Sequence, residues 1–272
     1  MPSDVPTASN ALIGVFDSGV GGLSILREIH RALPFHPTLY YADQAHLPYG
    51  TKSKNQLLDY VSAIVRYMIA DGAQVIVLAC NTASAACLHD LRAAHPEMPF
   101  VGMEPAIKPA VEASRTGIVG VLATQVTADG DLYRATLAKF AGEARVITQV
   151  APALVTLVES GEWASSEARQ LIAEIIAPIL HAGADQVALA CTHFPFLIEA
   201  LQAVAGEGVT FIDPSPAVAR QTRRVLIERG LLVETGTARA THRYFSSAAP
   251  ERLRAMITRL IGVDADVQHL IV

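Results

Sequence analysis

VIVLACNTAS, residues 75–84, is the stretch that decides the fold of this chain. Its apolar part has the pattern of a buried β-strand, and the polar residues after Cys80 indicate a turn followed by a helix. We therefore expect Cys80 at the carboxyl end of a strand, beside a helix N-terminus. Ligands bind outside such strand ends in open α/β sheets, and a helix N-terminus favours a thiolate. Cys80 is either a reactive thiol or a small buried hydrophobe, since free cysteines are often buried.

Strand and helix patterns alternate along the chain on both sides of this stretch. Helices are expected over residues 23–30, 53–70, 217–230 and 250–261, with others between the strands. The strands are expected over residues 12–16, 38–42, 75–79, 100–103, 117–123, 144–150, 186–190 and 241–245. This alternation predicts an α/β protein with mostly parallel sheets.

The two halves of the chain resemble one another. IGVFD, ending at Asp17, corresponds to VGVLAT, ending at Thr124, and VLACNT around Cys80 corresponds to ALACTH around Cys191. The separations are similar, 63 residues (17 to 80) and 67 residues (124 to 191). An internal duplication explains both facts. We expect two similar α/β domains, residues 1–104 with 214–272 and residues 105–213, related by a pseudo-two-fold axis, with the active site in the cleft between them.

Composition limits the class of protein. A chain of 272 residues with 51% hydrophobic and 17% charged residues predicts a globular protein with an ample core. The net charge of −5, with no basic run longer than a pair such as Arg223-Arg224, predicts no nucleic-acid partner. No apolar run approaches the ~20 residues of a membrane helix. Residues 1–10 are expected to be a loose tail and not a signal peptide.

The number of cysteines indicates the compartment. Three cysteines, an odd number, argue against a disulfide framework and predict a reducing, cytoplasmic location. Cys87 follows Cys80 by two helical turns and is expected to pack in the core.

Two cysteines that face one another across a cleft suit one type of reaction. A racemase or epimerase removes a proton from one face of a carbon and returns one to the other face, so each thiol is base in one direction and acid in the other. Asp17 and His193, one in each half, are placed to tune these thiols. Donors for a substrate carboxylate are available from Ser18, Asn81, Thr82, Thr192 and the backbone N–H groups of Tyr49 and Gly50.

A glycine-rich loop, DSGVGG at residues 17–22, follows the first expected strand. Its glycines do not make the G-x-G-x-x-G pattern of dinucleotide sites. They do allow backbone N–H groups to approach a ligand closely, and a helix start favours an anionic one.

These motifs together resemble the cofactor-independent glutamate racemases. The resemblance runs from Ile13 to about Gly262 and rests on GVFDSGVGG (14–22), PYG (48–50), ACNTA (79–83) and CTHFP (191–195), in that order. It implies two α/β domains, catalytic cysteines at Cys80 and Cys191, and no pyridoxal phosphate or other cofactor. It also implies a homodimer that supplies D-glutamate for peptidoglycan.

The resemblance extends to further residues of the site. It implies Asp17 and His193 beside the thiols and Glu159 as an accessory acid. One departure is visible, because this chain has Ala151 where the family usually has a cysteine before the segment of Glu159. The predicted substrate-binding residues are Asp17, Ser18, Pro48, Tyr49, Gly50, Asn81, Thr82, Thr124, Thr127, Thr192 and His193.

Each of these residues also has a structural interpretation. Asp17 can accept hydrogen bonds from turn N–H groups, His193 can be a turn residue, and Glu159 can be a solvated helix residue. Tyr49 and His46 can simply pack the loop that carries them.

Other functional classes leave different traces. A dithiol redox protein usually carries C-x-x-C, which is absent, and the histidines do not show the H-E-x-x-H spacing of a metal site. No lysine lies in a recognisable Schiff-base context. A racemase of another acidic amino acid such as aspartate, and a non-catalytic two-lobed amino-acid-binding protein, remain as alternatives.

Overall fold

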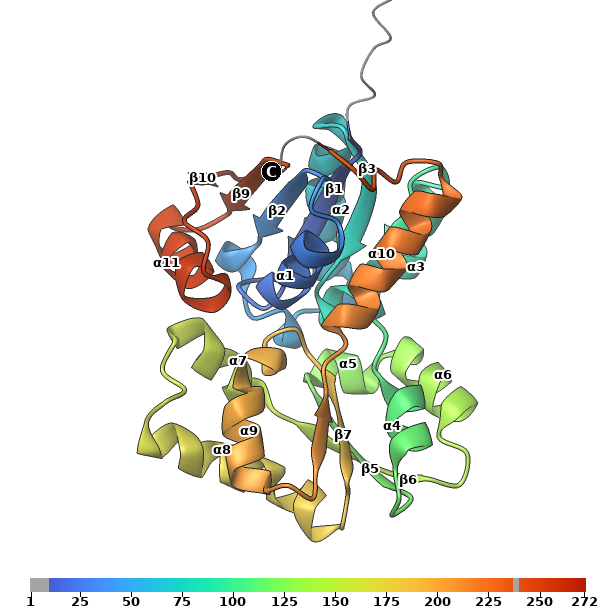
Figure 1. Ribbon diagram of the computed structural model, residues 1–272, viewed down its shortest axis with the longest axis vertical. Coiled ribbons are helices and arrows are strands. Elements are labelled where there is room, and N and C mark those ends of the chain that lie inside the picture. Colours follow the sequence, from blue (N-terminus) through green and yellow to red (C-terminus); the bar gives the residue numbers. More distant parts are fainter. Residues whose placement is uncertain (1–9, 237–239) are drawn as a thin grey trace, which may run out of the picture.

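The structure is a computed structural model that describes residues 10–236 and 240–272. The N-terminal tail expected from the sequence lies, apart from Asn10, outside the described residues. The chain forms two α/β units, one above the other in Figure 1, and each has its own parallel sheet. Within the described part of the chain, no helix has the length and apolarity that a membrane crossing requires.

The first unit is built on a six-stranded sheet with the order β10-β9-β2-β1-β3-β4, in which all neighbours are parallel. Its strands are β1 (Leu12–Asp17), β2 (Thr38–Ala42), β3 (Ala73–Leu78), β4 (Phe100–Val101), β9 (His242–Ser246) and β10 (Val267–His269). Its helices are α1 (Leu23–Ala32), α2 (Lys54–Ala70), α3 (Asn81–Ala94), α10 (Ser215–Glu228) and α11 (Pro250–Ile261).

The second unit is built on a four-stranded parallel sheet with the order β6-β5-β7-β8. Its strands are β5 (Ile118–Ala123), β6 (Arg145–Val150), β7 (Gln186–Ala190) and β8 (Thr210–Ile212). Its helices are α4 (Ile107–Ala113), α5 (Gln125–Asp129), α6 (Asp131–Phe140), α7 (Pro152–Ser160), α8 (Ser166–His181) and α9 (Ile198–Ala205).

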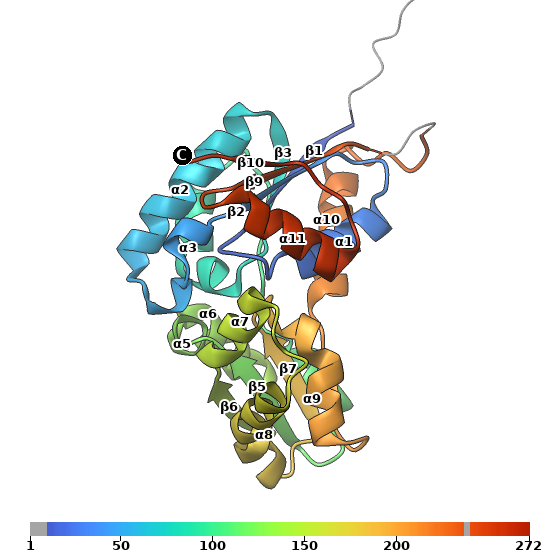
Figure 2. The ribbon, with the colours of Figure 1, turned by 90° about the vertical axis from the view of Figure 1, so that its left-hand side faces the viewer.

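The strand order repeats between the two units. In the first unit β1 lies between β2 and β3, with β4 beyond β3, and in the second unit β5, β6, β7 and β8 take the same places. This order agrees with the duplication inferred from the sequence. The chain then returns to the first unit, where β9 pairs with β2 and α10 packs against α1 (Figure 2). The α/β class and the parallel sheets expected from the alternating pattern are confirmed.

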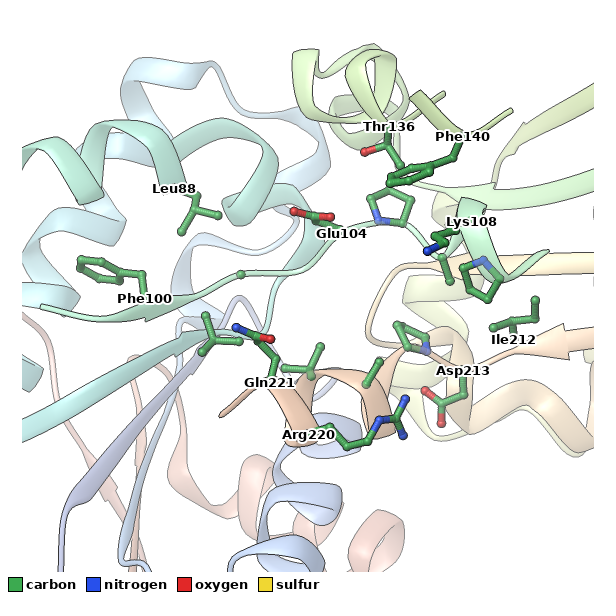
Figure 3. A pocket seen from close by; sticks show the side chains of 18 of the residues that line it. Leu88, Phe100, Glu104, Lys108, Thr136, Phe140, Ile212, Asp213, Arg220 and Gln221 are labelled. Atoms are coloured by element: carbon green, nitrogen blue, oxygen red, sulfur yellow. The ribbon is translucent and has the colours of Figure 1, made fainter. Parts of the chain in front are cut away.

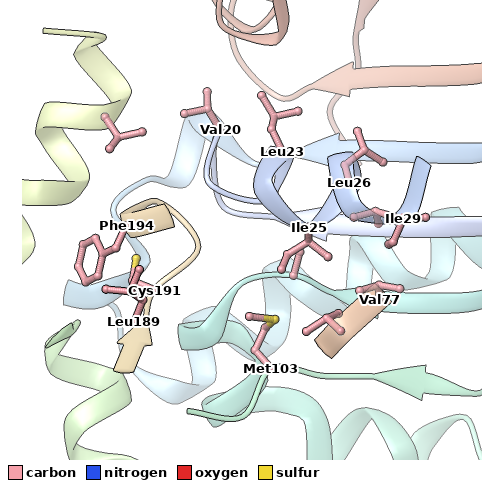
Figure 4. Packing of buried hydrophobic residues seen from close by; sticks show 14 of the residues in the cluster. Val20, Leu23, Ile25, Leu26, Ile29, Val77, Met103, Leu189, Cys191 and Phe194 are labelled. Carbon is pink, nitrogen blue, oxygen red and sulfur yellow. The ribbon is translucent and has the colours of Figure 1, made fainter. Parts of the chain in front are cut away.

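Helices cover both faces of each sheet. On one face of the first sheet, α2 and α3 pack over Phe16, Leu39 and Tyr41. On the other face, α1, α10 and α11 contribute to a cluster that continues into the second unit. Figure 4 shows this continuity, with Leu23 and Ile25 of α1 on one side and Leu189, Cys191 and Phe194 on the other. The two units therefore share apolar packing close to Cys191.

Local sequence signals explain several element boundaries. Ser53 and Gln56 form a capping box at the start of α2, because each side chain bonds the other residue's backbone N–H group. Gly161 and Gly262 have φ of 78° and 68° after α7 and α11, a left-handed conformation that glycine adopts without strain. The strand expected over residues 100–103 is shorter, since only Phe100 and Val101 pair with β3.

Candidate active site

The carboxyl ends of β1 and β3 face those of β5 and β7 across a cavity of about 270 Å³. Both cysteines singled out in the sequence line this cavity, Cys80 from the first unit and Cys191 from the second. Asp17, Glu159 and Thr127 are buried outside the lining of this cavity. The other predicted residues that line it are Ser18, Pro48, Tyr49, Gly50, Asn81, Thr82, Thr124, Thr192 and His193.

Cys80 lies between β3 and α3, as its position in the sequence predicts. It is the N-cap residue of α3, and its sulfur accepts a hydrogen bond from Ala83 N at 3.5 Å. Its thiol lies 3.6 Å from Ser18 Oγ. Burial raises the pKa of the Cys80 thiol to about 12, and the charge of Asp17 adds to this effect despite the opposing hydrogen bonds. Cys80 is therefore a protonated thiol at neutral pH, because desolvation outweighs the helix N-terminus.

Cys191 follows the last residue of β7 and has different partners. Its sulfur lies 3.6 Å from His193 Nδ1, and His193 Nε2 lies 2.8 Å from Glu159 Oε1. The three side chains form a buried row of thiol, imidazole and carboxylate. The sequence placed His193 beside this thiol, and the structure brings the two together. Glu159 is a buried partner of His193 and not a solvated helix residue.

The charges of this row support one another. Burial disfavours the imidazolium, but the hydrogen bonds to Cys191 and Glu159 outweigh it and raise the pKa of His193 well above its ordinary 6.5. Burial also opposes the charge of Glu159, yet His193, the N–H group of Val20 and Arg252 lower the pKa of that carboxyl. A protonated imidazole thus lies beside the Cys191 sulfur at neutral pH.

Asp17 reaches across to the second unit. Its carboxylate is fully buried and accepts hydrogen bonds from Gly19 N at 2.8 Å and from Thr192 Oγ1 at 3.0 Å. Burial raises the pKa of Asp17, while His193 and these hydrogen bonds lower it in part. Asp17 acts on Cys80 through its charge, and its hydrogen bonds orient Thr192, next to the other thiol.

The glycine-rich loop packs against the second unit at very short range. A Cβ atom on Gly21 would lie 2.5 Å from both His193 Nδ1 and Thr192 Oγ1, closer than real Cβ atoms come. The N–H groups of Gly19 and Val20 bind the carboxylates of Asp17 and Glu159. These two N–H groups thus bind the protein's own carboxylates and not a ligand. The absence of a side chain at Gly21 allows the two units to come this close together.

The polar lining of the cavity includes groups without a partner. The amide nitrogen and oxygen of Asn81 are both buried and make no hydrogen bond within the described part of the chain. Because unpaired buried polar groups are costly, an amide in this state indicates a polar ligand. Thr82 Oγ1 of the first unit lies 3.0 Å from Thr124 Oγ1 of the second unit. Thr124 Oγ1 in turn donates a hydrogen bond to Thr127 Oγ1 at 3.0 Å.

Comparison with known proteins identifies the family. Residues 13–222 match the family described as Asp/Glu/Hydantoin racemase. The chain belongs to this racemase family. The glutamate racemase of Ectopseudomonas mendocina is 46% identical over 259 residues, which cover 95% of this chain and 98% of that protein. The glutamate racemase of Pseudomonas aeruginosa is 44% identical over 97% of this chain and 98% of its own length.

Solved racemase structures have the same architecture. Glutamate racemase from Francisella tularensis in complex with D-glutamate has a TM-score of 0.84 at 25% identity, covering 97% of this chain and 98% of that one. The Escherichia coli glutamate racemase in complex with L-glutamate and the activator UDP-MurNAc-Ala has a TM-score of 0.84 at 33% identity, covering 96% and 97%.

Residues of this racemase site that the sequence did not single out lie behind Tyr49. Asp43 is buried at the end of β2 and accepts hydrogen bonds from Tyr49 Oη at 2.5 Å and from Ser247 Oγ at 2.8 Å. The sequence does contain one signal for Asp43, because it directly follows a strand that neighbours the strand of Asp17. Tyr49 thus lines the cavity while its hydroxyl is anchored away from it.

A second cavity, of about 590 Å³, lies between β4, α4, α6 and α10 and is shown in Figure 3. Charged side chains of both signs line it, including Glu104, Lys108, Asp213 and Arg220. None of the predicted catalytic or substrate-binding residues lies on its wall. Within residues 10–236 and 240–272, no three His, Cys, Asp or Glu side chains gather as metal ligands.

Proposed function

We propose that this protein is a glutamate racemase, which interconverts L- and D-glutamate by proton transfer between two thiols without a cofactor. One observation carries the proposal: Cys80 and Cys191, from corresponding places in two similar units, line the same cavity. A chiral carbon held between them presents one face to each sulfur. Glutamate as the substrate is supported by the relatives of similar length, which are glutamate racemases.

The proposed reaction moves one proton off the α-carbon and another onto it. In one direction Cys191 is the base and Cys80 the acid, and in the other direction the roles are exchanged. Removal of the proton places negative charge on the substrate carboxylate. The amide N–H group of Asn81, which has no partner within the described residues, is available to stabilise this charge.

Each thiol must give up or accept a proton, and its surroundings prepare it for this in a different way. Cys80 has a pKa of about 12 because of burial and Asp17, so it enters the reaction as a proton donor. The Cys191 sulfur lies 3.6 Å from the imidazole of His193, which Glu159 holds in its charged form. Asp17, His193 and Glu159 are proposed to tune the thiols, whereas Ser18, Asn81, Thr82 and Thr192 contact the substrate. Further proposed substrate contacts come from Pro48, Tyr49, Gly50 and Thr124. Thr127, predicted from the sequence as a contact, is buried outside the cavity and is proposed to act through its hydrogen bond with Thr124.

Isotope exchange tests this mechanism. Each glutamate enantiomer is incubated separately in D₂O without added cofactor, and deuterium at the α-carbon is measured in both enantiomers. We expect deuterium in the product enantiomer with little in the recovered substrate, since each face has its own thiol. Rapid exchange into the starting enantiomer would indicate one shared base. The absence of interconversion would favour an amino-acid-binding protein, and faster racemisation of aspartate would reassign the substrate.

The biological setting belongs to the same proposal. From the resemblance to glutamate racemases we also propose that the enzyme is cytoplasmic, supplies D-glutamate for peptidoglycan and acts as a homodimer. Growth of a D-glutamate auxotroph that carries this gene tests the supply of D-glutamate. Sedimentation of the purified protein tests the homodimer. We also propose two domains, residues 1–104 with 214–272 and residues 105–213, a division supported by which strands belong to each sheet.

A further inference from the structure

Both carboxylate oxygens of Glu159 have partners. Oε1 accepts hydrogen bonds from Val20 N and from His193 Nε2, each at 2.8 Å. Oε2 accepts a hydrogen bond from Gln44 Nε2 at 3.4 Å. Val20 and Gln44 belong to the first unit, whereas Glu159 and His193 belong to the second. The first unit therefore fixes the carboxylate that holds the imidazole beside Cys191.

The amide of Gln44 is itself held in one orientation. Ser246 Oγ donates to Gln44 Oε1 at 3.1 Å, so the amide nitrogen is the end that points to Glu159. Ser246 is fully buried at the end of β9, and the next residue, Ser247, accepts a hydrogen bond from Ala45 N at 2.9 Å. The two serines thus connect the end of β9 to the segment that carries Gln44. Gln44 does not line the cavity that holds the two thiols.

We propose that Gln44 is a positioning residue for proton transfer at Cys191, an inference that rests on the proposed two-thiol racemisation. Its N–H group keeps Glu159 Oε2 in place, so that Oε1 stays aligned with His193 Nε2. A hydrogen bond to a carboxylate also stabilises the charged form. The imidazolium of His193 then keeps its counter-ion while the proton moves to and from the Cys191 sulfur. Cys80 has no such chain of partners and is not affected.

Replacing Gln44 by leucine removes the donor at nearly constant volume. We expect kcat to fall about three- to tenfold, because at 3.4 Å the lost contact is worth no more than an ordinary hydrogen bond, with KM for glutamate changed by less than about twofold. Without the donor, Glu159 holds the imidazolium less firmly. Alkylation of Cys191 by iodoacetamide should then slow at neutral pH, because the pKa of His193 falls and its imidazolium is lost at a lower pH. Alkylation of Cys80, measured by mass spectrometry on the same sample, should not change.

Ser246→Ala tests the same chain one step further out. Loss of the hydroxyl frees the Gln44 amide, so we expect a smaller effect on kcat in the same direction. The double variant with Gln44→Leu should be no slower than Gln44→Leu alone, because both changes act through one contact. Gln170→Leu is the matched control, since Gln170 Nε2 bonds the carboxylate of Glu174 at 3.0 Å on an exposed face of α8. This control should leave kcat and both alkylation rates unchanged.

The outcomes separate this inference from the proposed function. If Gln44→Leu has the kcat and the Cys191 alkylation profile of the unaltered enzyme, the positioning role is wrong, while racemisation that depends on both cysteines still stands. If alkylation of Cys80 and Cys191 changes equally, the variant has loosened the site in general, which also overturns the role. If the unaltered protein does not racemise glutamate, the proposed function itself has failed.

Discussion

The two units of this protein place a cysteine at the same point of the same scaffold and surround it differently. Cys80 and Cys191 are each 5% exposed and each follow the third strand of their repeat. The nearest polar groups of Cys80 are a hydroxyl and a backbone N–H group. Cys191 instead has an imidazole that is held by a carboxylate. Duplication therefore explains the matching positions, and divergence of the neighbouring residues explains the different polar partners of the two sulfurs.

Each unit also completes the surroundings of the other unit's thiol. Thr192, beside Cys191, donates its hydroxyl to Asp17 and accepts at its carbonyl a hydrogen bond from Ser24 Oγ at 3.0 Å. In the other sense, Thr124 of the second unit meets Thr82 beside Cys80. Both units therefore contribute side chains to the surroundings of each thiol, and burial of the apolar cluster that spans them stabilises this arrangement.

Removal of either thiol should lower the rate of racemisation more than any other single change. Cys80→Ala and Cys191→Ala should each lower kcat for racemisation by about 10²–10⁴-fold or more, because a positioned general acid or base is lost and the other thiol serves only one face. The circular dichroism of glutamate, followed over time from each pure enantiomer, measures racemisation in both directions. Cys87→Ala is the control, since this buried cysteine packs in the core away from the cavity. Retained activity in either single variant would contradict the two-thiol mechanism.

The sequence predicts the positions of the thiols better than their environments. Strand patterns and the repeat are local signals, so the α/β class, the ends of β3 and β7 and the place of His193 beside Cys191 could all be inferred. The contacts of Glu159 with Gln44 and Val20 join residues 115 and 139 positions apart, and no local pattern encodes them. The same holds for the hydrogen bond of Asp17 to Thr192. Whether a helical glutamate is solvated or buried depends on packing that only the structure shows.

Loss of the carboxylate behind His193 should have the next largest effect. Glu159→Gln keeps the shape of the side chain and removes the charge that holds the imidazolium. We expect kcat to fall about 10–10²-fold, the equivalent of a hydrogen bond to a charged group worth about 1.5–3 kcal/mol. The alkylation rate of Cys191 should fall while that of Cys80 does not. Glu174→Gln on exposed α8 should retain full activity, and equal effects of the two variants would show that the charge of Glu159 has no special role.

The ion pair of His193 and Glu159 should also make the stability of the protein depend on pH. The raised pKa of His193 gives stabilisation that is complete below its ordinary 6.5 and is lost as pH rises through the folded value. The lowered pKa of Glu159 gives stabilisation that is present above its ordinary 4.5 and is lost on acidification. The free energy of unfolding of the unaltered protein, minus that of Glu159→Gln, should therefore be largest between pH 4.5 and 6.5.

Urea unfolding at several pH values measures this difference. Above pH 6.5 it should shrink by up to about 1.4 kcal/mol per pH unit, the value for one proton. A difference that stays constant from pH 6 to pH 9 would show that His193 is not held as an imidazolium in the folded protein.

The smallest expected effect concerns the outer contact between α11 and the segment that carries Glu159. The guanidinium carbon of Arg259 lies 4.6 Å from the ring centroid of Trp163, the single tryptophan of the chain, just after α7. Arg259→Ala should lower the free energy of unfolding by about 0.5–1 kcal/mol, the range for an exposed cation–π contact, and should change Trp163 fluorescence. Arg254→Ala on the same helix removes only a surface ion pair with Asp266 and should leave the fluorescence unchanged.

The inner hydrogen bonds of Glu159 predict the effect of Arg259→Ala on catalysis. Because Val20 and Gln44 hold the carboxylate directly, kcat should fall by less than about threefold when the outer contact is lost. A loss of kcat as large as that of Glu159→Gln would instead place the control of the Cys191 half in α11. It would then be the packing of the two units as a whole, and not the hydrogen bonds at the carboxylate, that distinguishes the two thiols.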